Sequence, residues 1–153
     1  MMPLNIRHDD WILVGDGSKA WLLRNAGDAE QLRLESMEVI EQDNPPTREQ
    51  GTDRPGRRAD QGVQQRSAME ETDRHRLEEQ RFAGRIAEAL YKAAHAGAFE
   101  RLILVAPPKV LGDLRKVLHD EVKQRLAGTL DKTLTNHSLA DLEKVLLASR
   151  AGA

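Results

Sequence analysis

Hydrophobic residues near the start of the chain come in short runs that are separated by turn formers. Residues 11–14 (WILV) and 20–23 (AWLL) are two such runs, and GDGSK lies between them. Two short apolar runs joined at an Asp-Gly turn predict a β-hairpin. Over residues 31–40 apolar and polar positions partly alternate, with Leu32 and Leu34 on one face, which predicts a third strand. The three segments together predict an antiparallel meander.

The period changes to a helical one over residues 69–96. Phe82, Ile86, Leu90 and Ala93 recur at spacings of four and three, which places them on one face of a helix. The first part of this segment, MEETDRHRLEEQR, is nearly all charged and predicts a solvated extension of the helix. Gly97 follows as its expected C-cap.

Residues 102–105 (LILV) form a continuous apolar run, typical of a strand that is buried on both faces. After a Pro-Pro pair, apolar residues at every fourth position predict a second amphipathic helix that Gly128 stops; they are Val110, Leu114, Leu118 and Val122. The stretch GTLDKTLTN then predicts an edge strand.

A last helix is predicted after Ser138, which suits its N-cap. Its expected inward side chains are Leu139, Leu142, Val145 and Leu146. The whole order predicts one α/β domain over residues 1–153, with a mixed β-sheet flanked by helices.

Residues 41–68 interrupt this order with a long loop between the third strand and the first long helix. Three prolines and three glycines punctuate the segment, and no strand or helix period survives in it. A loop of this length inside a compact domain is typically functional or disordered. Its candidate RNA-binding or partner-binding residues are Arg48, Arg54, Arg57, Arg58 and Arg66, and its candidate catalytic residues are Gln61, Gln64 and Gln65.

Overall composition narrows the classes of function. The net charge is −2, so any contact with nucleic acid must come from a local patch. The chain has no cysteine, which excludes disulfides and thiol chemistry. No apolar run approaches the roughly 20 residues that span a bilayer, and the N-terminal MMPLNIRHDDWILV lacks a signal-peptide layout. We therefore expect a cytoplasmic protein without a membrane partner.

Other candidate residues have ordinary structural interpretations. A hairpin turn explains Asp16 in GDGSK, and a solvated helix face explains His75, Glu78 and Glu79 despite their metal-compatible spacing. Lys109 after the Pro-Pro pair suits an anion near a helix N-terminus, but no glycine-rich cradle accompanies it. The serines lack a nucleophile elbow. The sequence therefore gives no metal site and no cofactor.

Several strings together resemble one family over almost the whole chain. They are WILVGDGSKAWLL, GTDRPGRRAD, RFAGRIAEALYKA, LILVAPPKVLGDLRKVL and DKTLTN. They resemble the bacterial host-attachment protein family, a bacterial relative of the central domain of archaeo-eukaryotic release factors. The resemblance implies a ribonuclease-H-like mixed sheet. It also implies that the long loop occupies the place of the Gly-Gly-Gln loop, which promotes hydrolysis of peptidyl-tRNA.

The loop departs from that family pattern, since residues 61–65 read QGVQQ and Val63 stands where a second glycine is expected. Close approach of the backbone to an ester favours glycine, which lacks a Cβ atom. We therefore favour a factor without catalytic residues that contacts the ribosome, ribosomal RNA, tRNA or a protein partner. One alternative is a peptidyl-tRNA hydrolase that acts in ribosome rescue, and another is a surface attachment factor. The oligomeric state stays open.

Overall fold

The computed structural model describes residues 5–42 and 68–151. This part of the chain contains a five-stranded sheet with the order β3-β2-β1-β4-β5. The strands are β1 (Trp11–Gly15), β2 (Lys19–Asn25), β3 (Leu34–Glu41), β4 (Leu102–Ala106) and β5 (Leu126–Asp131). The helices are α3 (Ala68–His95), α4 (Pro108–Val117), α5 (Asp120–Lys123) and α6 (Leu139–Ala151).

The sheet is mixed, which confirms the predicted fold class. β2 pairs antiparallel with β1 and with β3, so the predicted meander is present. β4 pairs parallel with β1 and with β5. Because β1, β4 and β5 run in the same direction, their carboxyl ends lie at one edge of the sheet.

The third strand begins at Leu34, later than the predicted residue 31. Asp28 holds the preceding residues in a turn, because its carboxylate accepts hydrogen bonds from the backbone N–H groups of Glu30 and Gln31 at 2.9 and 2.8 Å. These bonds draw residues 30 and 31 away from the ladder. Leu32 is nevertheless buried, as its alternation with Leu34 predicted.

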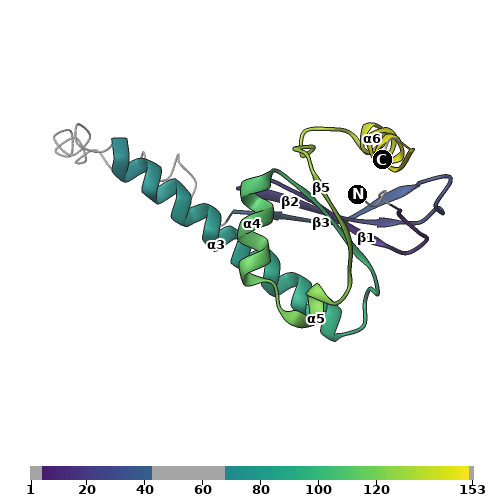
Figure 1. Cartoon of the computed structure of the whole chain (residues 1–153), viewed down its shortest axis with the longest axis horizontal. Helices are drawn as coiled ribbons and strands as arrows, with labels where there is room; N and C mark the ends of the chain where they lie inside the picture. Colours follow the sequence, from purple (N-terminus) through teal and green to yellow (C-terminus); the bar gives the residue numbers. More distant parts are fainter. Residues whose placement is uncertain (1–4, 43–67, 152–153) are drawn as a thin grey trace.

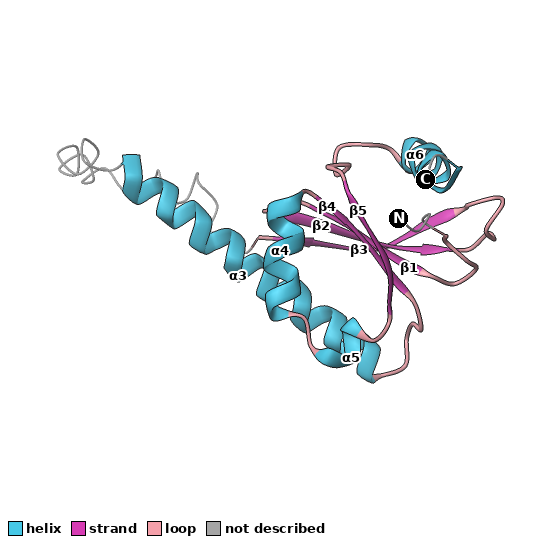
Figure 2. Ribbon diagram, viewed as in Figure 1, coloured by secondary structure: helices cyan, strands magenta, loops and turns pink. Residues whose placement is uncertain are grey.

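Helices cover both faces of the sheet. Figures 1 and 2 show α3, α4 and α5 on one side and α6 on the other. β4 is buried along its whole length because it contributes to both cores: Leu102 and Leu104 pack under α3 and α4, whereas Ile103 and Val105 pack under α6. This confirms the prediction that the strand is buried on two faces.

The N-terminal part of helix α3 extends past the core (Figure 1). Its apolar stripe, Phe82, Ile86 and Leu90, is almost completely buried, whereas residues 72–75 are exposed. At 1.5 Å per residue, the part that precedes Phe82 is roughly 20 Å long. We call residues 68–81 the arm. The helix ends as predicted, with Gly97 at a φ of 77°.

One predicted helix is wrong in its extent. The four-residue repeat continues through Leu118 and Val122, but α4 ends at Val117 and a separate short helix α5 follows. Leu118 and His119 are extended, and the His119 imidazole accepts a hydrogen bond from the Glu121 N–H to begin α5. Gly128 does not stop a helix but lies inside β5, paired with Ile103. Both helices bury their apolar repeat, so periodicity alone did not reveal the break.

Helix α6 begins as the sequence indicates, since the Ser138 hydroxyl accepts a hydrogen bond from the Asp141 N–H at 3.1 Å. Leu142 and Leu146 are fully buried, while Leu139 and Val145 are half-buried. Among the described residues, no helix is long and apolar enough to cross a membrane.

Candidate functional site

A cleft of about 340 Å³ lies at the carboxyl edge of the sheet, at the root of the arm. It is lined by Asp16, Gly17, Ser18, Gln42, His75, Glu78 and Glu79. The first three residues follow β1, Gln42 follows β3, and the last three belong to the arm. The carboxyl ends of parallel strands are a common place for ligand sites in α/β sheets. This edge is therefore the candidate functional site.

Asp16 organises the hairpin side of the cleft. One carboxylate oxygen accepts hydrogen bonds from the backbone N–H groups of Ser18 and Lys19, both at 2.8 Å, and the other accepts one from the Thr135 hydroxyl at 2.7 Å. Burial raises the pKa of the Asp16 carboxyl, but these hydrogen bonds outweigh it and bring the pKa below its ordinary value. Asp16 is thus a charged turn residue that ties the end of β1 to the segment after β5.

The arm packs tightly against that turn. A Cβ atom at Gly17 would lie 2.8 Å from the Glu79 Oε2 atom and 2.9 Å from the Glu79 Cγ atom. Distances below 3.0 Å essentially never occur for real Cβ atoms, so the glycine permits this approach. The hairpin turn and α3 are therefore in direct contact at the cleft.

An ion pair braces the arm from its other side. The two terminal nitrogens of Arg76 donate to the two carboxylate oxygens of Asp113 on α4, at 2.8 and 2.6 Å. Arg76 also donates to Glu79 at 3.0 Å. The pKa of the Arg76 guanidinium is raised, chiefly by its hydrogen bonds to Asp113. Asp113 is only 5% exposed, and a planar guanidinium fork suits such a two-point contact.

The donor set of the cleft does not favour a metal ion. No group of three or more His, Asp or Glu side chains among residues 5–42 and 68–151 has the geometry to hold one. The Asp16 oxygens already accept from protein donors, and Glu79 faces Arg76. The cleft lies between the arm and the hairpin turn, and Asp16, Glu78 and Glu79 give it an acidic lining.

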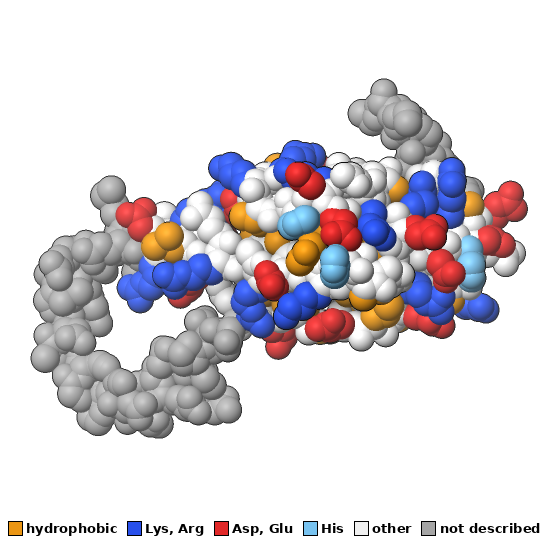
Figure 3. Space-filling view, turned by 90° about the horizontal axis from the view of Figure 1, so that it is seen from below, with side chains coloured by type: hydrophobic (Ala, Val, Ile, Leu, Met, Phe, Trp, Pro, Cys, Tyr) orange, Lys and Arg blue, Asp and Glu red, His pale blue; other side chains and the backbone are white. Residues whose placement is uncertain are grey.

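The wider surface carries both signs of charge. Figure 3 shows Lys and Arg side chains intermixed with Asp and Glu along one side of the molecule, and an orange hydrophobic area beside two histidines. No single-sign area dominates this view. A binding site for a polyanion must therefore be local, as the net charge indicated.

The structure brings together residues that the sequence offered separately. Asp16 and the arm residues His75, Glu78 and Glu79 were unrelated candidates, and they line one cleft. Asp113 was missed. Its signal was a carboxylate on the buried stripe of an amphipathic helix, between Val110 and Leu114. Such a residue needs a buried partner.

The remaining candidates fall into two groups. Lys109 is exposed at the start of α4, and Ser138 acts as a helix cap. The candidates of the long loop lie outside the described residues: Arg48, Arg54, Arg57, Arg58, Arg66, Gln61, Gln64 and Gln65. Their roles stay predictions.

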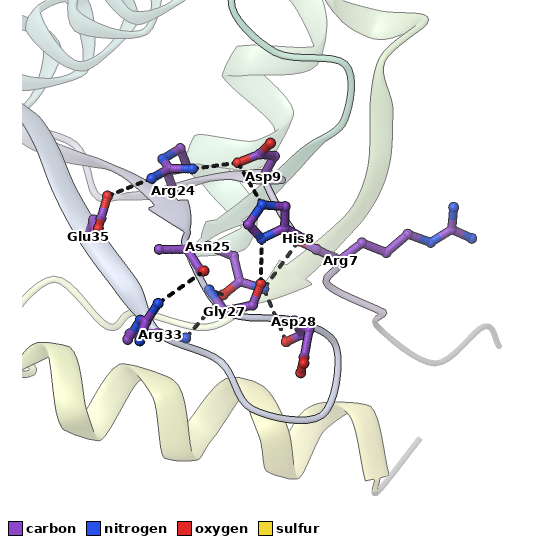
Figure 4. Close-up of polar contacts among 10 residues, drawn as sticks. Arg7, His8, Asp9, Arg24, Asn25, Gly27, Asp28, Arg33 and Glu35 are labelled. Atoms are coloured by element: carbon purple, nitrogen blue, oxygen red, sulfur yellow. Dashed lines mark hydrogen bonds and ion pairs between the residues drawn. The ribbon is translucent and has the colours of Figure 1, made fainter.

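The opposite edge of the sheet holds a polar cluster of a different kind (Figure 4). The amide of Asn25 is completely buried, and its oxygen accepts hydrogen bonds from the N–H groups of Gly27 and Arg33, both at 3.0 Å. Its nitrogen donates to the carbonyl oxygens of Arg7 and Asp28 at 3.1 and 3.2 Å. We call this the Asn25 cluster. All its hydrogen-bonding capacity is used within the chain.

A mixed sheet with an antiparallel meander, parallel strands beside it and an insertion before a long helix defines a release-factor-like α/β domain. Residues 9–146 match the family model of bacterial archaeo-eukaryotic release factor family 12, and the chain belongs to that family. The predicted kinship with the release-factor central domain is thereby confirmed. A comparison with curated proteins found no match.

Proposed function

We propose that this protein is a cytoplasmic factor that contacts the RNA of the translation machinery through residues 44–66. The segment carries five arginines, and its sequence has three acids, Glu49, Asp53 and Asp60. Arginine forks bind phosphates well, and arginine-rich segments can order on RNA. Membership of a release-factor-related family supports a partner in translation.

The observation that carries the proposal is the brace on the arm. An isolated helix end that extends past the core would fray. Here Arg76 and Glu79, in the middle and at the base of the arm, are held by α4 and by the hairpin turn. The brace fixes the helix that follows residues 44–66 in the sequence relative to the sheet and α4, which supports the proposal that this segment makes a contact.

The proposed contact is not catalytic. A release loop brings its backbone close to the peptidyl ester, and Val63 adds a branched side chain where glycine would allow that approach. The competing function is hydrolysis of peptidyl-tRNA through Gln61, Gln64 or Gln65. Membership of the release-factor-related family is the observation that supports this second function.

The first test is a pull-down of tagged protein from cells, with and without ribonuclease. We expect the wild type to retain ribosomal RNA, and Arg54→Ala/Arg57→Ala/Arg58→Ala to lose most of it. The matched control is Arg7→Ala/Lys132→Ala/Lys144→Ala, which removes the same charge from exposed positions and should retain RNA as the wild type does. Absence of RNA from the wild-type sample, or a protein partner that persists after ribonuclease, contradicts the RNA contact. Recovery of the protein only at the cell surface contradicts it as well.

The second test is a peptide-release assay on stalled ribosomes. The contact function predicts no turnover above the background. Turnover that disappears when one of the three loop glutamines is changed to alanine would establish the hydrolase and remove the non-catalytic assignment.

A further inference from the structure

The outer face of α4 carries three cations without an opposing acid. Lys109, Arg115 and Lys116 are exposed, and none of them has an ion pair or hydrogen bond to a described residue. The only acid of this helix, Asp113, is buried toward α3 and paired with Arg76. We call the three cations the α4 basic face.

Helical geometry concentrates these charges. Lys109 and Lys116 are seven residues apart, so they lie on one stripe two turns apart, separated by roughly 10 Å along the helix axis. Arg115 widens the stripe on one side. Ion-paired arginines elsewhere in the described chain, such as Arg24 and Arg101, already have carboxylate partners and contribute less free positive charge.

Two glycines beside the α4 basic face leave the helix backbone uncovered by side chains. A Cβ atom at Gly112, inside α4, or at Gly84, on the neighbouring α3, would meet nothing within 4 Å. A glycine inside a helix is less favourable than alanine, and no contact in the described chain requires either one. A partner that approaches these backbones closely would account for both residues.

A shallow groove of about 160 Å³ is lined by residues of α3, by Val117 at the end of α4 and by His119. Its lining includes Gly84, Tyr91, Val117 and His119, and the Tyr91 and His119 rings stack with centroids 4.1 Å apart. Glu88 also borders it, so the groove itself is not basic. The positive charge belongs to the adjacent outer face of α4.

We propose that the α4 basic face binds the phosphate backbone of RNA, as a second contact in addition to the one proposed for residues 44–66. Clustered Lys and Arg side chains attract phosphates without reading the sequence. The positive charge of the α4 basic face complements phosphate groups. The absence of a side chain at Gly112 lets a polyanion strand approach the helix closely. This inference rests on the proposed function, because it assigns another part of the same RNA-binding surface.

The test is binding of the full chain to a fluorescently labelled single-stranded RNA at several salt concentrations. The variant Lys109→Gln/Arg115→Gln/Lys116→Gln should bind at least tenfold more weakly at about 0.1 M salt. The slope of log K against log salt should fall in magnitude by about 2, since each single-strand phosphate contact contributes about 0.7. The matched control is Arg7→Gln/Lys132→Gln/Lys144→Gln, with two lysines and one arginine removed elsewhere.

A charge-keeping variant, Lys109→Arg/Arg115→Lys/Lys116→Arg, should restore the affinity and the slope. Thermal melting of all five proteins, the Arg54/Arg57/Arg58 variant included, shows whether each one is folded. Normal binding by the folded Gln variant overturns the inference, and loss of binding by the Arg54/Arg57/Arg58 variant in the same assay would still support the proposed function. If the wild type binds no RNA, both fail. Loss of a ribonuclease-resistant protein partner in the Gln variant identifies a protein surface and also overturns the inference.

Discussion

The two edges of the sheet use polar residues in opposite ways. At one edge the Asn25 cluster surrounds a fully buried neutral amide whose donors and acceptors are all satisfied by backbone groups (Figure 4). At the other edge, polar and charged residues of the hairpin turn and of the arm line an open cleft of about 340 Å³. Buried neutral networks in which every group is satisfied rigidify a structure. At the open edge Asp16 and Glu79 also have partners within the chain, but they line a solvent-accessible cleft.

The two edges therefore connect different parts of the chain. The Asn25 cluster ties the N-terminal segment, the end of β2 and the turn before β3 into one unit. The opposite edge ties the arm to the hairpin turn and to α4. We expect damage to the first edge to lower stability without changing RNA contact, and damage to the second to lower both.

The largest expected effect is that of Asn25→Ala. Removal of the amide leaves the N–H groups of Gly27 and Arg33 and the carbonyl oxygen of Asp28 without this partner, so the free energy of unfolding should fall by about 3 kcal/mol. Urea unfolding measures this loss. Gln31→Ala, at an exposed side chain of the same turn, is the control and should stay within about 0.5 kcal/mol of the wild type. If Asn25→Ala lowered the free energy of unfolding by less than about 1 kcal/mol, the Asn25 cluster would not be the more stabilising of the two edges.

Arg76→Met should have the next largest effect, about 2 kcal/mol, because it leaves the Asp113 carboxylate buried without its partner. The double variant Arg76→Met/Asp113→Leu should recover part of that loss, which a double-mutant cycle measures. Both variants should retain less RNA than the wild type, since the arm loses its brace.

The control for the brace is Arg81→Met on the same helix, where the exposed arginine has no ion pair to a described residue. It should leave stability and RNA retention unchanged. If Arg76→Met retained as much RNA as the wild type, the ion pair between Arg76 and Asp113 would not be needed for RNA contact.

A smaller, pH-dependent effect is expected from Asp16→Asn. Because the pKa of Asp16 in the folded protein lies below the ordinary 3.8, its contribution is present above that value and is lost as the pH falls through the lower folded pKa. The variant should lose roughly 1 kcal/mol at neutral pH, and the difference from the wild type should shrink below about pH 4. Unfolding measured at several pH values tests this, with the exposed Asp131→Asn as control. A difference that grows on acidification would contradict the assigned hydrogen bonds.

The smallest effect is expected from Gly17→Ala. The new methyl group meets the flexible end of Glu79, which can move aside, so the loss should be about 0.5 kcal/mol. Gly84→Ala should instead stabilise the protein by up to about 1 kcal/mol, because it fills open space on a helix. Thermal melting of the two variants compares Gly17, which lies against Glu79, with Gly84, which has open space beside it.

Local patterns were sufficient for most of the elements. The Asp-Gly turn, the buried run of β4 and the Ser138 cap all act through neighbouring residues, and each was predicted correctly. The break between α4 and α5 was missed because Leu118 and Val122 are buried in either arrangement. The sequence signal there, His119 as a side-chain cap, is weak, since histidine is not a usual N-cap residue.

The candidate site was less accessible to sequence reasoning. Asp16 and Glu79 are 63 positions apart, and nothing in their spacing joins them. They meet because β1 and α3 bring their ends to the same edge. The partner of Asp113 was similarly hidden, since Arg76 lies in a run of charged residues where many pairs are possible.

The sequence by itself determined the order of elements, the mixed α/β class, the family resemblance and the position of the Arg/Gln loop. These features depend on local periodicity, turn residues and short motifs, which are properties of neighbouring positions. Only the tertiary structure decided that the arm is braced by Asp113, that Asp16 shares a cleft with the arm, and that three cations of α4 pair with no acid among the described residues. Those features depend on which distant side chains meet in space, because an ion pair or a cleft forms only after the sheet has set the position of each helix.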